Sequence, residues 1–376
     1  MTAFTRTLRD SVPVLLNAAV NERAFPGAYV VIGNAHGALY ELGVGQLDWS
    51  ESPQPDRHTL WDLASLTKVL ATTMLAAQLA ERGELDLDRP VQRYLPLWTG
   101  PGKELVSVRH LLTHTSGLPA FRPYDQQTRN PDSLAMLLFL TELERPAGNR
   151  TVYSDIGAFV LGRVVETLGS ARLDALAAER LFGPLGLRET MFRPPPELRS
   201  RIAPTEIDTL RGGLVRGAVH DERAYYLGGV AAHAGLFSTG ADLSRFAMML
   251  LRGGRLDSVR VLDDRTIDLF TRYADSTLSN RALGWQKPER DGMRDRFPSS
   301  SWAGSYMSSR AFGHTGFTGT SIAIDPALDL FIILLSNRVN PTRDNPGITG
   351  VRRRLADVVV TARRQQLGLT LNHGLR

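Results

Sequence analysis

The sequence contains no cysteine among its 376 residues. Disulfide bonds, thiolate zinc sites, iron-sulfur clusters and cysteine nucleophiles are therefore excluded. Long apolar runs are also missing: the best candidate, residues 331–335, is strand-sized, whereas a membrane-spanning helix needs about 18 to 20 apolar residues. The remaining composition, 43% hydrophobic and 22% charged, is typical of a globular protein with one large core or two smaller ones.

Lysine is scarce, since only Lys68, Lys103 and Lys287 occur among the 44 basic residues and the others are arginines. Arginine cannot give up its proton at working pH, so each lysine is an unusual feature of this chain. The net charge of +5 comes from residues 341–376, which hold seven arginines and two aspartates. No aromatic residues alternate with these arginines, so we predict a solvated helix face and no nucleic-acid partner.

The first 27 residues share two features with a signal peptide, because Arg6 and Arg9 precede the apolar run 12–20. The apolar residues recur at helical intervals, however, and lead into the strand-like segment 28–32 without a spacer for cleavage. We therefore predict a first helix of the mature fold. Without a leader or a membrane span, we expect a cytoplasmic location.

Strand patterns lie near both ends of the chain and helical patterns lie between them. The expected strands are 28–32, 38–44, 320–324 and 331–336, and the expected helices are 66–82 with its first turn at Ser65, 156–168, 242–251 and 350–366. This order predicts an α+β fold, with an antiparallel sheet built from both chain ends, flanked by helices, and an inserted mainly helical domain. We assign 1–64 and 252–376 to the sheet-containing region and 65–251 to the helical region, with Ser65 and Lys68 at the junction.

Three short motifs contain residues that can do chemistry: Ser65-Leu66-Thr67-Lys68, Tyr153-Ser154-Asp155 and Gly313-His314-Thr315-Gly316. A Ser-x-x-Lys at a helix start places serine and lysine on one face, where the helix N-terminus favours developing negative charge. A neutral lysine there can take the serine proton. Singly, each motif also has a structural interpretation: a capping serine with a solvated lysine, an N-cap aspartate behind a core tyrosine, and a hydrogen-bonded histidine in a glycine-rich turn.

Together and in this order, the three motifs resemble those of the serine β-lactamase and penicillin-binding-protein family, in the branch of class C β-lactamases and related esterases. The segments HLLTHTSGLP at 110–119 and PAGNRTVYSDIG at 146–157 also resemble segments of that family. The likeness covers roughly residues 8–365. In 110–119, the family uses His110 and His114 structurally, so we expect both to be buried and hydrogen-bonded.

The resemblance implies that Ser65 attacks a carbonyl to form an acyl-enzyme, that Lys68 and Tyr153 shuttle protons, and that water then releases the acyl group. It implies an oxyanion hole made of the Ser65 and Phe317 backbone N–H groups. Neither a metal nor a cofactor is implied. The residues that the resemblance places in contact with substrate are Asp155, His314, Thr315 and Gly316.

Two departures from the family pattern bear on the activity. Asp155 stands where the family often has asparagine, and a negative charge beside Lys68 is expected to raise the lysine pKa. His314 stands where β-lactamases and D-alanyl-peptidases often have lysine, so that a titrating group replaces a fixed cation. These departures favour an esterase-like or amidase-like member over an efficient β-lactamase.

The segment 220–229 (HDERAYYLGG) and the residues 233–238 resemble the active-site rim of members suspected to act on cell-wall peptides or muropeptides. His220, Asp221 and His233 also suggest a metal site, but the chain has neither the His-x-x-x-His nor the HExxH spacing there. We therefore predict a hydrogen-bonded rim.

The sequence thus predicts a serine hydrolase acting on an ester or amide, either a carboxylic ester or a cell-wall-derived peptide or muropeptide, with weak β-lactamase activity. The expected partner is a small-molecule substrate. Two alternatives belong to other classes of protein. One is a catalytically silent relative that binds peptidoglycan fragments, and the other is a metal-dependent hydrolase that would lose activity on chelation.

Overall fold

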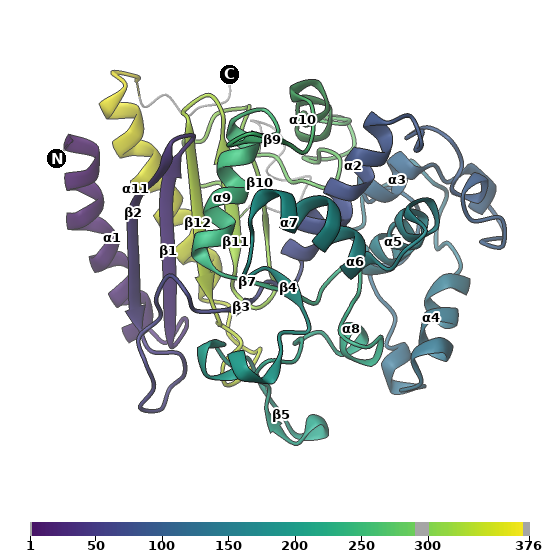
Figure 1. Cartoon of the computed structure of the whole chain (residues 1–376), viewed down its shortest axis with the longest axis horizontal. Helices are drawn as coiled ribbons and strands as arrows, with labels where there is room; N and C mark the ends of the chain where they lie inside the picture. The colour runs from purple at the N-terminus through teal and green to yellow at the C-terminus, as the bar shows by residue number, and fades with distance from the viewer. Residues whose placement is uncertain (1, 290–300, 371–376) are drawn as a thin grey trace.

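A five-stranded antiparallel sheet organises the computed structural model, which describes residues 2–289 and 301–370 (Figure 1). The strand order is β10-β11-β12-β1-β2. These strands are β1 (Gly27–Asn34), β2 (Gly37–Gly45), β10 (Phe312–Thr315), β11 (Ser321–Asp325) and β12 (Leu330–Ser336). In the central pair, Ala28 of β1 lies opposite Ser336 of β12. The sheet is therefore built from both chain ends, which confirms the predicted α+β fold.

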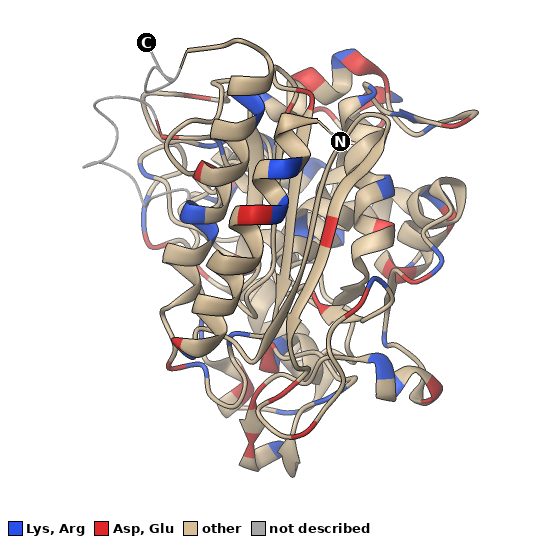
Figure 2. Cartoon of the chain, turned by 90° about the vertical axis from the view of Figure 1, so that its left-hand side faces the viewer, with Lys and Arg blue, Asp and Glu red and all other residues tan. Residues whose placement is uncertain are grey.

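Two long helices, α1 (Ala3–Asn21) and α11 (Ile348–Gln366), lie side by side on the outer face of the sheet (Figures 1 and 2). On α1, the buried residues Phe4, Leu8, Val12 and Leu16 recur every four positions, so one face of the helix packs into the core. The first helix predicted from this spacing is confirmed.

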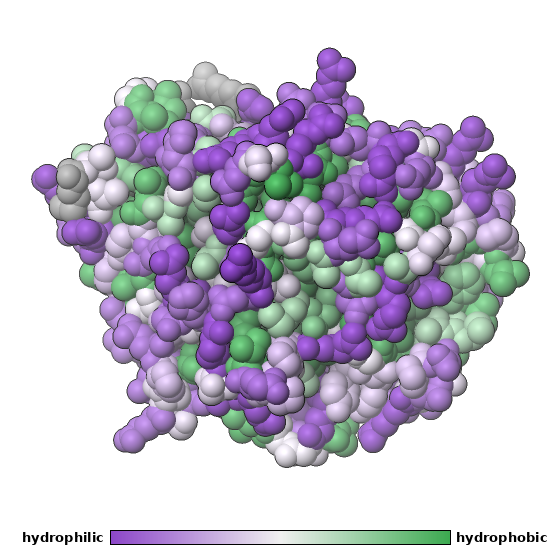
Figure 3. Space-filling model, in the orientation of Figure 1, coloured by the Kyte–Doolittle hydropathy of each residue, from purple (hydrophilic) through white to green (hydrophobic). Residues whose placement is uncertain are grey.

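The helical region covers the other face of the sheet (Figure 1). Helix α9 (Gly240–Leu251) lies close to β1. A Cβ at Gly240 would be only 2.6 Å from Tyr29 Cε1, so glycine at this position allows the close packing. The space-filling view in the orientation of Figure 1 shows a largely hydrophilic surface, with apolar residues in small groups (Figure 3). The other helices are α2 (Thr73–Glu81), α3 (Val108–Leu112), α4 (Pro131–Leu140), α5 (Asp155–Gly169), α6 (Leu173–Ala177), α7 (Gly183–Leu185), α8 (Glu222–Tyr226) and α10 (Asp264–Thr271).

Several short strands within or beside the helical region were not predicted, because two or three residues show no periodicity. Strand β7 (Leu236–Ser238) pairs with β3 (Trp61–Asp62) and β4 (Met191–Phe192) in a small sheet. This sheet ties the segment directly before Ser65 to residues 236–238. Two small hairpins complete the strands: β5 (Ile207–Asp208) with β6 (Gly213–Leu214), and β8 (Arg255–Leu256) with β9 (Val259–Arg260).

A single apolar cluster continues from the sheet into the helical region, since it includes Tyr29 and Val31 of β1 as well as Leu66 and Val160. The division into 1–64 with 252–376 and 65–251 stays a prediction. No helix in the described ranges is long and apolar enough to cross a membrane.

The basic C-terminal segment is not simply a solvated face, and that interpretation is corrected. Arg352 of α11 is only 7% exposed, and its Nη2 donates to the carbonyls of Gly316 and Thr320 at 2.9 and 2.7 Å. Arg343 binds two carboxylates, Glu206 and Glu222. These two arginines therefore connect the C-terminal segment to residues around the candidate site.

Candidate active site

Ser65 lies in the turn between β3 and the helix that follows. Ala64, directly before it, has a φ of 45°, in the left-handed region that residues with a side chain rarely adopt. The Ala64 N–H donates to Asp62 Oδ1 at 2.8 Å, which holds the turn. Strained backbone of this kind persists where the surroundings over-determine it, and such places are often functional.

The helix after Ser65 begins less regularly than predicted. Its first part is a π-helical turn, η1 (Lys68–Thr72), in which the Thr73 N–H bonds to the Lys68 carbonyl five residues earlier. Regular α-helix follows only from Thr73, as α2. A π turn leaves no mark in the hydrophobic period, so the sequence predicted one continuous helix. Such turns recur at functional sites.

Lys68 is buried, with 4% of its surface exposed, and its ammonium group has three acceptors. Nζ donates to Ser65 Oγ at 2.9 Å and to the His233 carbonyl at 3.0 Å, and it forms an ion pair with Asp155 Oδ1 at 2.8 Å. An ammonium has three donors and no acceptor, whereas a neutral amine would point a lone pair at one of these oxygens. The geometry therefore fits the protonated form.

The electrostatics agree with this geometry. Burial alone lowers the pKa of Lys68, but the negative charge of Asp155 and the neighbouring Tyr153 outweigh it, so the pKa is raised above its ordinary value. This is the direction expected from an aspartate at position 155. Burial alone raises the pKa of Asp155. The positive charges of Lys68 and other nearby cationic groups outweigh this effect, so the pKa lies below its ordinary value.

Tyr153 lies just before α5, and its ring is packed among groups from four other segments. The ring centroid is 4.6 Å from that of His114 and 5.8 Å from that of His314. Lys68 Nζ and Arg281 Cζ lie 4.9 and 5.0 Å from it. The phenol oxygen is buried and has no hydrogen-bond partner among the described residues. The hydroxyl nevertheless interacts with the Lys68 ammonium, because Tyr153 contributes to the raised pKa of Lys68.

Ser154, rather than Asp155, caps α5, because Ser154 Oγ accepts the Gly157 N–H at 2.9 Å. The N-cap interpretation of Asp155 is thus wrong, and its carboxylate faces Lys68 instead. The Ser154 N–H donates to Nδ1 of His114 at 3.1 Å. Burial, and then nearby cations, hold the pKa of His114 well below its usual range. The expected buried, hydrogen-bonded His114 is confirmed.

A closed ring of polar contacts passes through Lys68. Arg223 Nη2 donates to Asp155 Oδ2 at 3.2 Å and to Asp221 Oδ2 at 2.9 Å. Asp221 Oδ1 accepts from His233 Nε2 at 3.1 Å, and the carbonyl of the same histidine binds Lys68. We call Lys68, Asp155, Arg223, Asp221 and His233 the lysine ring. The sequence placed 220–229 and His233 at the rim but gave no sign of their contact with Lys68.

The connection between β10 and β11 lies against the residues before Ser65. Thr320 Oγ1 donates to the Leu63 carbonyl at 3.1 Å. A Cβ at Gly316 would lie 2.1 Å from Thr320 Oγ1 and 2.4 Å from Leu63 O, so only glycine fits there. Residues 313–315 were predicted to precede a strand, but they belong to β10, at the sheet edge.

The sequence suggested His314 as a titrating substitute for a cation, and its surroundings disfavour that role. It is 2% exposed, and its Nδ1 donates to the Thr315 carbonyl at 2.9 Å. Burial, and then the charges of Arg281 and Lys68, hold its pKa well below the usual range. His314 is therefore neutral around pH 7.

The two predicted oxyanion donors are available. Within 2–289 and 301–370, neither the Ser65 nor the Phe317 N–H donates to another group of the protein. The Phe317 side chain is 50% exposed, and its ring stacks on that of His220 with centroids 5.7 Å apart. Two unused backbone donors beside a serine suit a developing negative charge.

A pocket of about 440 Å³ opens over Ser65. The predicted site residues that line it are Ser65, Tyr153, Asp155 and Phe317. Lys68 lies beneath Ser65. The remaining three predicted residues, His314, Thr315 and Gly316, do not line the pocket, so their contact with substrate stays a prediction. Gly316 instead allows the β10–β11 connection to pack closely against Leu63.

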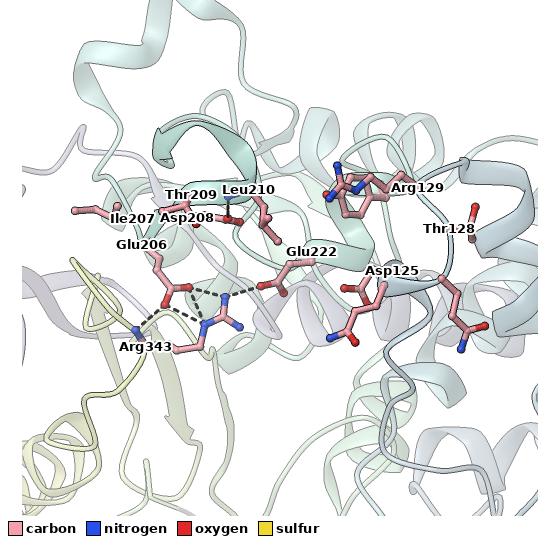
Figure 4. A pocket seen from close by; sticks show the side chains of 13 residues that line it. Asp125, Thr128, Arg129, Glu206, Ile207, Asp208, Thr209, Leu210, Glu222 and Arg343 are labelled. Atoms are coloured by element: carbon pink, nitrogen blue, oxygen red, sulfur yellow. Dashed lines mark hydrogen bonds and ion pairs between the residues drawn. The ribbon is translucent and has the colours of Figure 1, made fainter.

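A second chamber of about 520 Å³ adjoins this pocket (Figure 4). Asp125, Gln126, Glu222 and Arg343 line both cavities. Arg343 lies between Glu206 and Glu222, with Nη2 at 2.5 Å from a carboxylate oxygen of each (Figure 4). The chamber gives room for a substrate larger than a simple acetyl ester.

His220 and His233, which suggested a metal site in the sequence, contact different carboxylates. His220 Nε2 lies 2.9 Å from Glu206 Oε2, while His233 binds Asp221. In the part of the chain that the structure describes, no group of three or more His, Cys, Asp or Glu is arranged to hold a metal ion.

Comparison with known proteins gives the family. The family model described as Beta-lactamase matches residues 13–356. The chain belongs to the beta-lactamase family. A protein of Salmonella schwarzengrund named "Putative D-alanyl-D-alanine carboxypeptidase" is 31% identical over 320 residues, which are 77% of this chain and 72% of that protein. The family resemblance seen in the sequence is thereby confirmed.

Solved structures of the beta-lactamase fold superpose over nearly the whole chain. EstCE1, described as a hydrolase with promiscuous acyltransferase activity, has a TM-score of 0.75 and 21% identity over 95% of this chain and 99% of its own. A simvastatin synthase variant from Aspergillus terreus has a TM-score of 0.73 and 23% identity over 97% and 99%. These likenesses establish the fold.

Proposed function

We propose that this member of the beta-lactamase family is a serine hydrolase that forms an acyl-enzyme on Ser65. The observation that carries the proposal is the 2.9 Å contact between Lys68 Nζ and Ser65 Oγ at the base of a pocket that Tyr153 also lines. A serine needs a nearby group to take its proton before it becomes an effective nucleophile.

In the proposed reaction, Ser65 Oγ forms a bond to the substrate carbonyl carbon while its proton passes to a deprotonated partner, either the Tyr153 phenolate or, once Lys68 has given up one ammonium proton, the lysine amine. The Ser65 and Phe317 N–H groups stabilise the negative charge on the carbonyl oxygen. The bond to the leaving group then breaks, and the leaving group takes up the proton. Water attacks the acyl-enzyme by the reverse route and frees Ser65.

The charges of the pocket favour a substrate without a carboxylate at the scissile bond. Arg223 is bound by Asp155 and Asp221, and Arg343 is bound by Glu206 and Glu222. His314 is neutral and lies behind the wall. No unpaired cation therefore lines this pocket in the described ranges. A carboxylic ester, or a cell-wall-derived amide whose end is neutral, suits it better than a peptide ending in free D-alanine.

The first test is hydrolysis of p-nitrophenyl acetate and butyrate by the wild type and Ser65→Ala. We expect turnover that is lost in Ser65→Ala, and an acylated Ser65 in the mass spectrum of the wild type. A matched pair, N-acetyl-D-alanyl-D-alanine and its C-terminal amide, then tests the substrate end. We expect a higher kcat/KM for the amide.

The outcomes separate the candidate functions. Undiminished ester turnover in Ser65→Ala would rule out Ser65 as the nucleophile. Preference for the free carboxylate by about tenfold or more would instead support a carboxypeptidase and contradict the charge argument. Binding of muropeptides with no turnover of any of these substrates would support the silent binding protein, which the intact Ser65–Lys68 contact disfavours. Activity lost on chelation would support the metal-dependent alternative.

A further inference from the structure

The lysine ring joins two basic side chains to two carboxylates. Lys68 and Arg223 contribute positive charges, Asp155 and Asp221 negative ones, and the ring closes through His233, which contributes to lowering the pKa of both aspartates. Burial makes these charges consequential, since the Lys68 and Arg223 side chains are only 5% and 13% exposed. Other charged or titratable groups near the ring are Tyr153, Asp125, Arg281, His114 and His314.

Asp155 is shared between two cations through its two oxygens. Oδ1 pairs with Lys68 at 2.8 Å and Oδ2 with Arg223 at 3.2 Å. Arg223 uses the single nitrogen Nη2 for both of its carboxylates, while Nη1 is buried and has no partner among the described residues. Arg223 therefore does not form the bidentate pair with one carboxylate that is common for structural arginines.

We infer that Arg223 is a positioning residue that weakens the hold of Asp155 on Lys68 and so sets the pH at which Ser65 becomes reactive. The inference rests on the proposed function, because it assumes that Ser65 must give up its proton through Lys68 and Tyr153. Arg223 acts through Asp155 and does not need to touch the substrate.

The charges predict in which direction each substitution shifts the pH dependence of Ser65 reactivity. Removing the cation at 223 leaves the full negative charge of Asp155 for Lys68, which stabilises the ammonium and makes proton transfer harder at a given pH. Removing the charge at 155 has the opposite effect. The acid limb of the pH–rate profile, where the reactivity of Ser65 rises with pH, should therefore move to higher pH in Arg223→Gln and to lower pH in Asp155→Asn.

The test measures the rate at which a fluorophosphonate labels Ser65 from about pH 6 to 10, by mass spectrometry. In this reaction Ser65 Oγ forms a bond to phosphorus and gives its proton to the neighbouring base, the P–F bond breaks and fluoride leaves. We expect limb shifts of about one pH unit in opposite directions, which is about tenfold in rate at a fixed pH on the limb. Arg223→Lys should keep the acid side of the pH profile where it lies in the wild type, and so should Arg260→Gln, at an exposed pair with Asp263.

A merely structural role for Arg223 gives a different result. It would slow Arg223→Gln by the same factor at every pH, and that outcome overturns the inference, as does a shift of both variants in one direction. Absence of Ser65 labelling in the wild type at every pH would overturn the proposed function itself, and the inference with it.

A second readout does not depend on reactivity. With three lysines in the chain, carbon-13 labelling at lysine Cε gives three signals, and the Lys68 signal is assigned by its absence in Lys68→Arg. We expect the titration midpoint of Lys68 to be lower in Asp155→Asn than in the wild type. An unchanged midpoint would show that Asp155 does not control the lysine, which overturns the inference.

Discussion

At the scale of single residues, the proposed reaction divides the handling of one proton between two side chains. Lys68 is held as an ammonium by three oxygens, while the Tyr153 hydroxyl is buried without a partner in the described ranges. A group whose donors are all in use is a poor acceptor. We therefore expect Tyr153, once its phenol has lost its own proton, to take the Ser65 proton, and Lys68 to orient the serine and stabilise the charge that develops nearby.

Tyr153→Phe tests this division. The hydroxyl that is removed makes no hydrogen bond to a described residue, so we expect an unchanged or slightly higher Tm. Loss of the acid-base group should lower kcat/KM for p-nitrophenyl butyrate by at least about a hundredfold. The two measurements together separate chemistry from folding. A drop in Tm of several degrees, or activity near that of the wild type, would contradict the assignment.

The sequence predicted the residues of the site better than their connections. Ser65 and Lys68 belong to one short motif, and Tyr153 and Asp155 to another. Both motifs are visible in the sequence, and the family resemblance predicted that they meet in one site. The contact of Arg223 with Asp155 joins the first turns of α8 and α5, 68 residues apart, and the charge of an arginine does not reveal its partner. The histidine at 314 likewise looked like a titrating group, because its burial depends on the packing of the whole sheet edge.

At the scale of the elements, long periodic segments were predictable and short ones were not. The hairpin of β1 and β2, the helices α5 and α9, and the strands β11 and β12 follow from period and turn residues. The strand β10 contains Gly313 and ends at Thr315, directly before Gly316, and glycines weaken a strand pattern. Its pairing is determined by its neighbour β11 rather than by its own sequence.

Gly316→Ala tests the close fit of the β10–β11 connection. The added Cβ would overlap Thr320 Oγ1 and Leu63 O, so we expect a loss of about 1 to 3 kcal/mol in the free energy of unfolding. Since Phe317 follows directly, esterase activity should fall as well. Gly350→Ala, in α11, is the control: its Cβ would lie 3.3 Å from the end of the flexible Arg354 side chain, and helix propensity favours alanine by about 1 kcal/mol. Equal stability of the two variants in urea unfolding would contradict the steric argument.

At the scale of the whole molecule, Glu206 joins three distant parts of the chain. It accepts from Arg343 in the C-terminal segment and from His220 at the pocket rim, and it lies next to β5. Burial raises the pKa of Glu206, but the hydrogen bonds from His220 and Arg343 lower it more, to about 2. The ionised form is therefore strongly favoured in the folded protein.

Acid stability should depend on this carboxylate. Because the folded-state pKa is depressed, its contribution is present above about pH 4.5 and is lost as the pH falls toward 2. We expect Glu206→Gln to unfold about 2 kcal/mol more easily at pH 7, and its stability to vary less between about pH 5 and 2 than that of the wild type. Asp257→Asn, at an exposed pair with Arg245, is the control and should match the wild type. Parallel pH curves for wild type and Glu206→Gln would contradict the prediction.

The pairing of β1 with β12 also constrains how the chain matures during synthesis. Roughly 300 residues separate Ala28 from Ser336, and a ribosome needs on the order of 15 to 60 s to add them. Until then the β1–β2 hairpin has an open edge, and the N–H of Phe317, which belongs to the late part of the chain, is not yet beside Ser65. The nascent protein therefore carries the proposed nucleophile, Ser65, long before the proposed oxyanion hole is complete, and we expect the proposed hydrolysis only after β12 has been released and has joined β1.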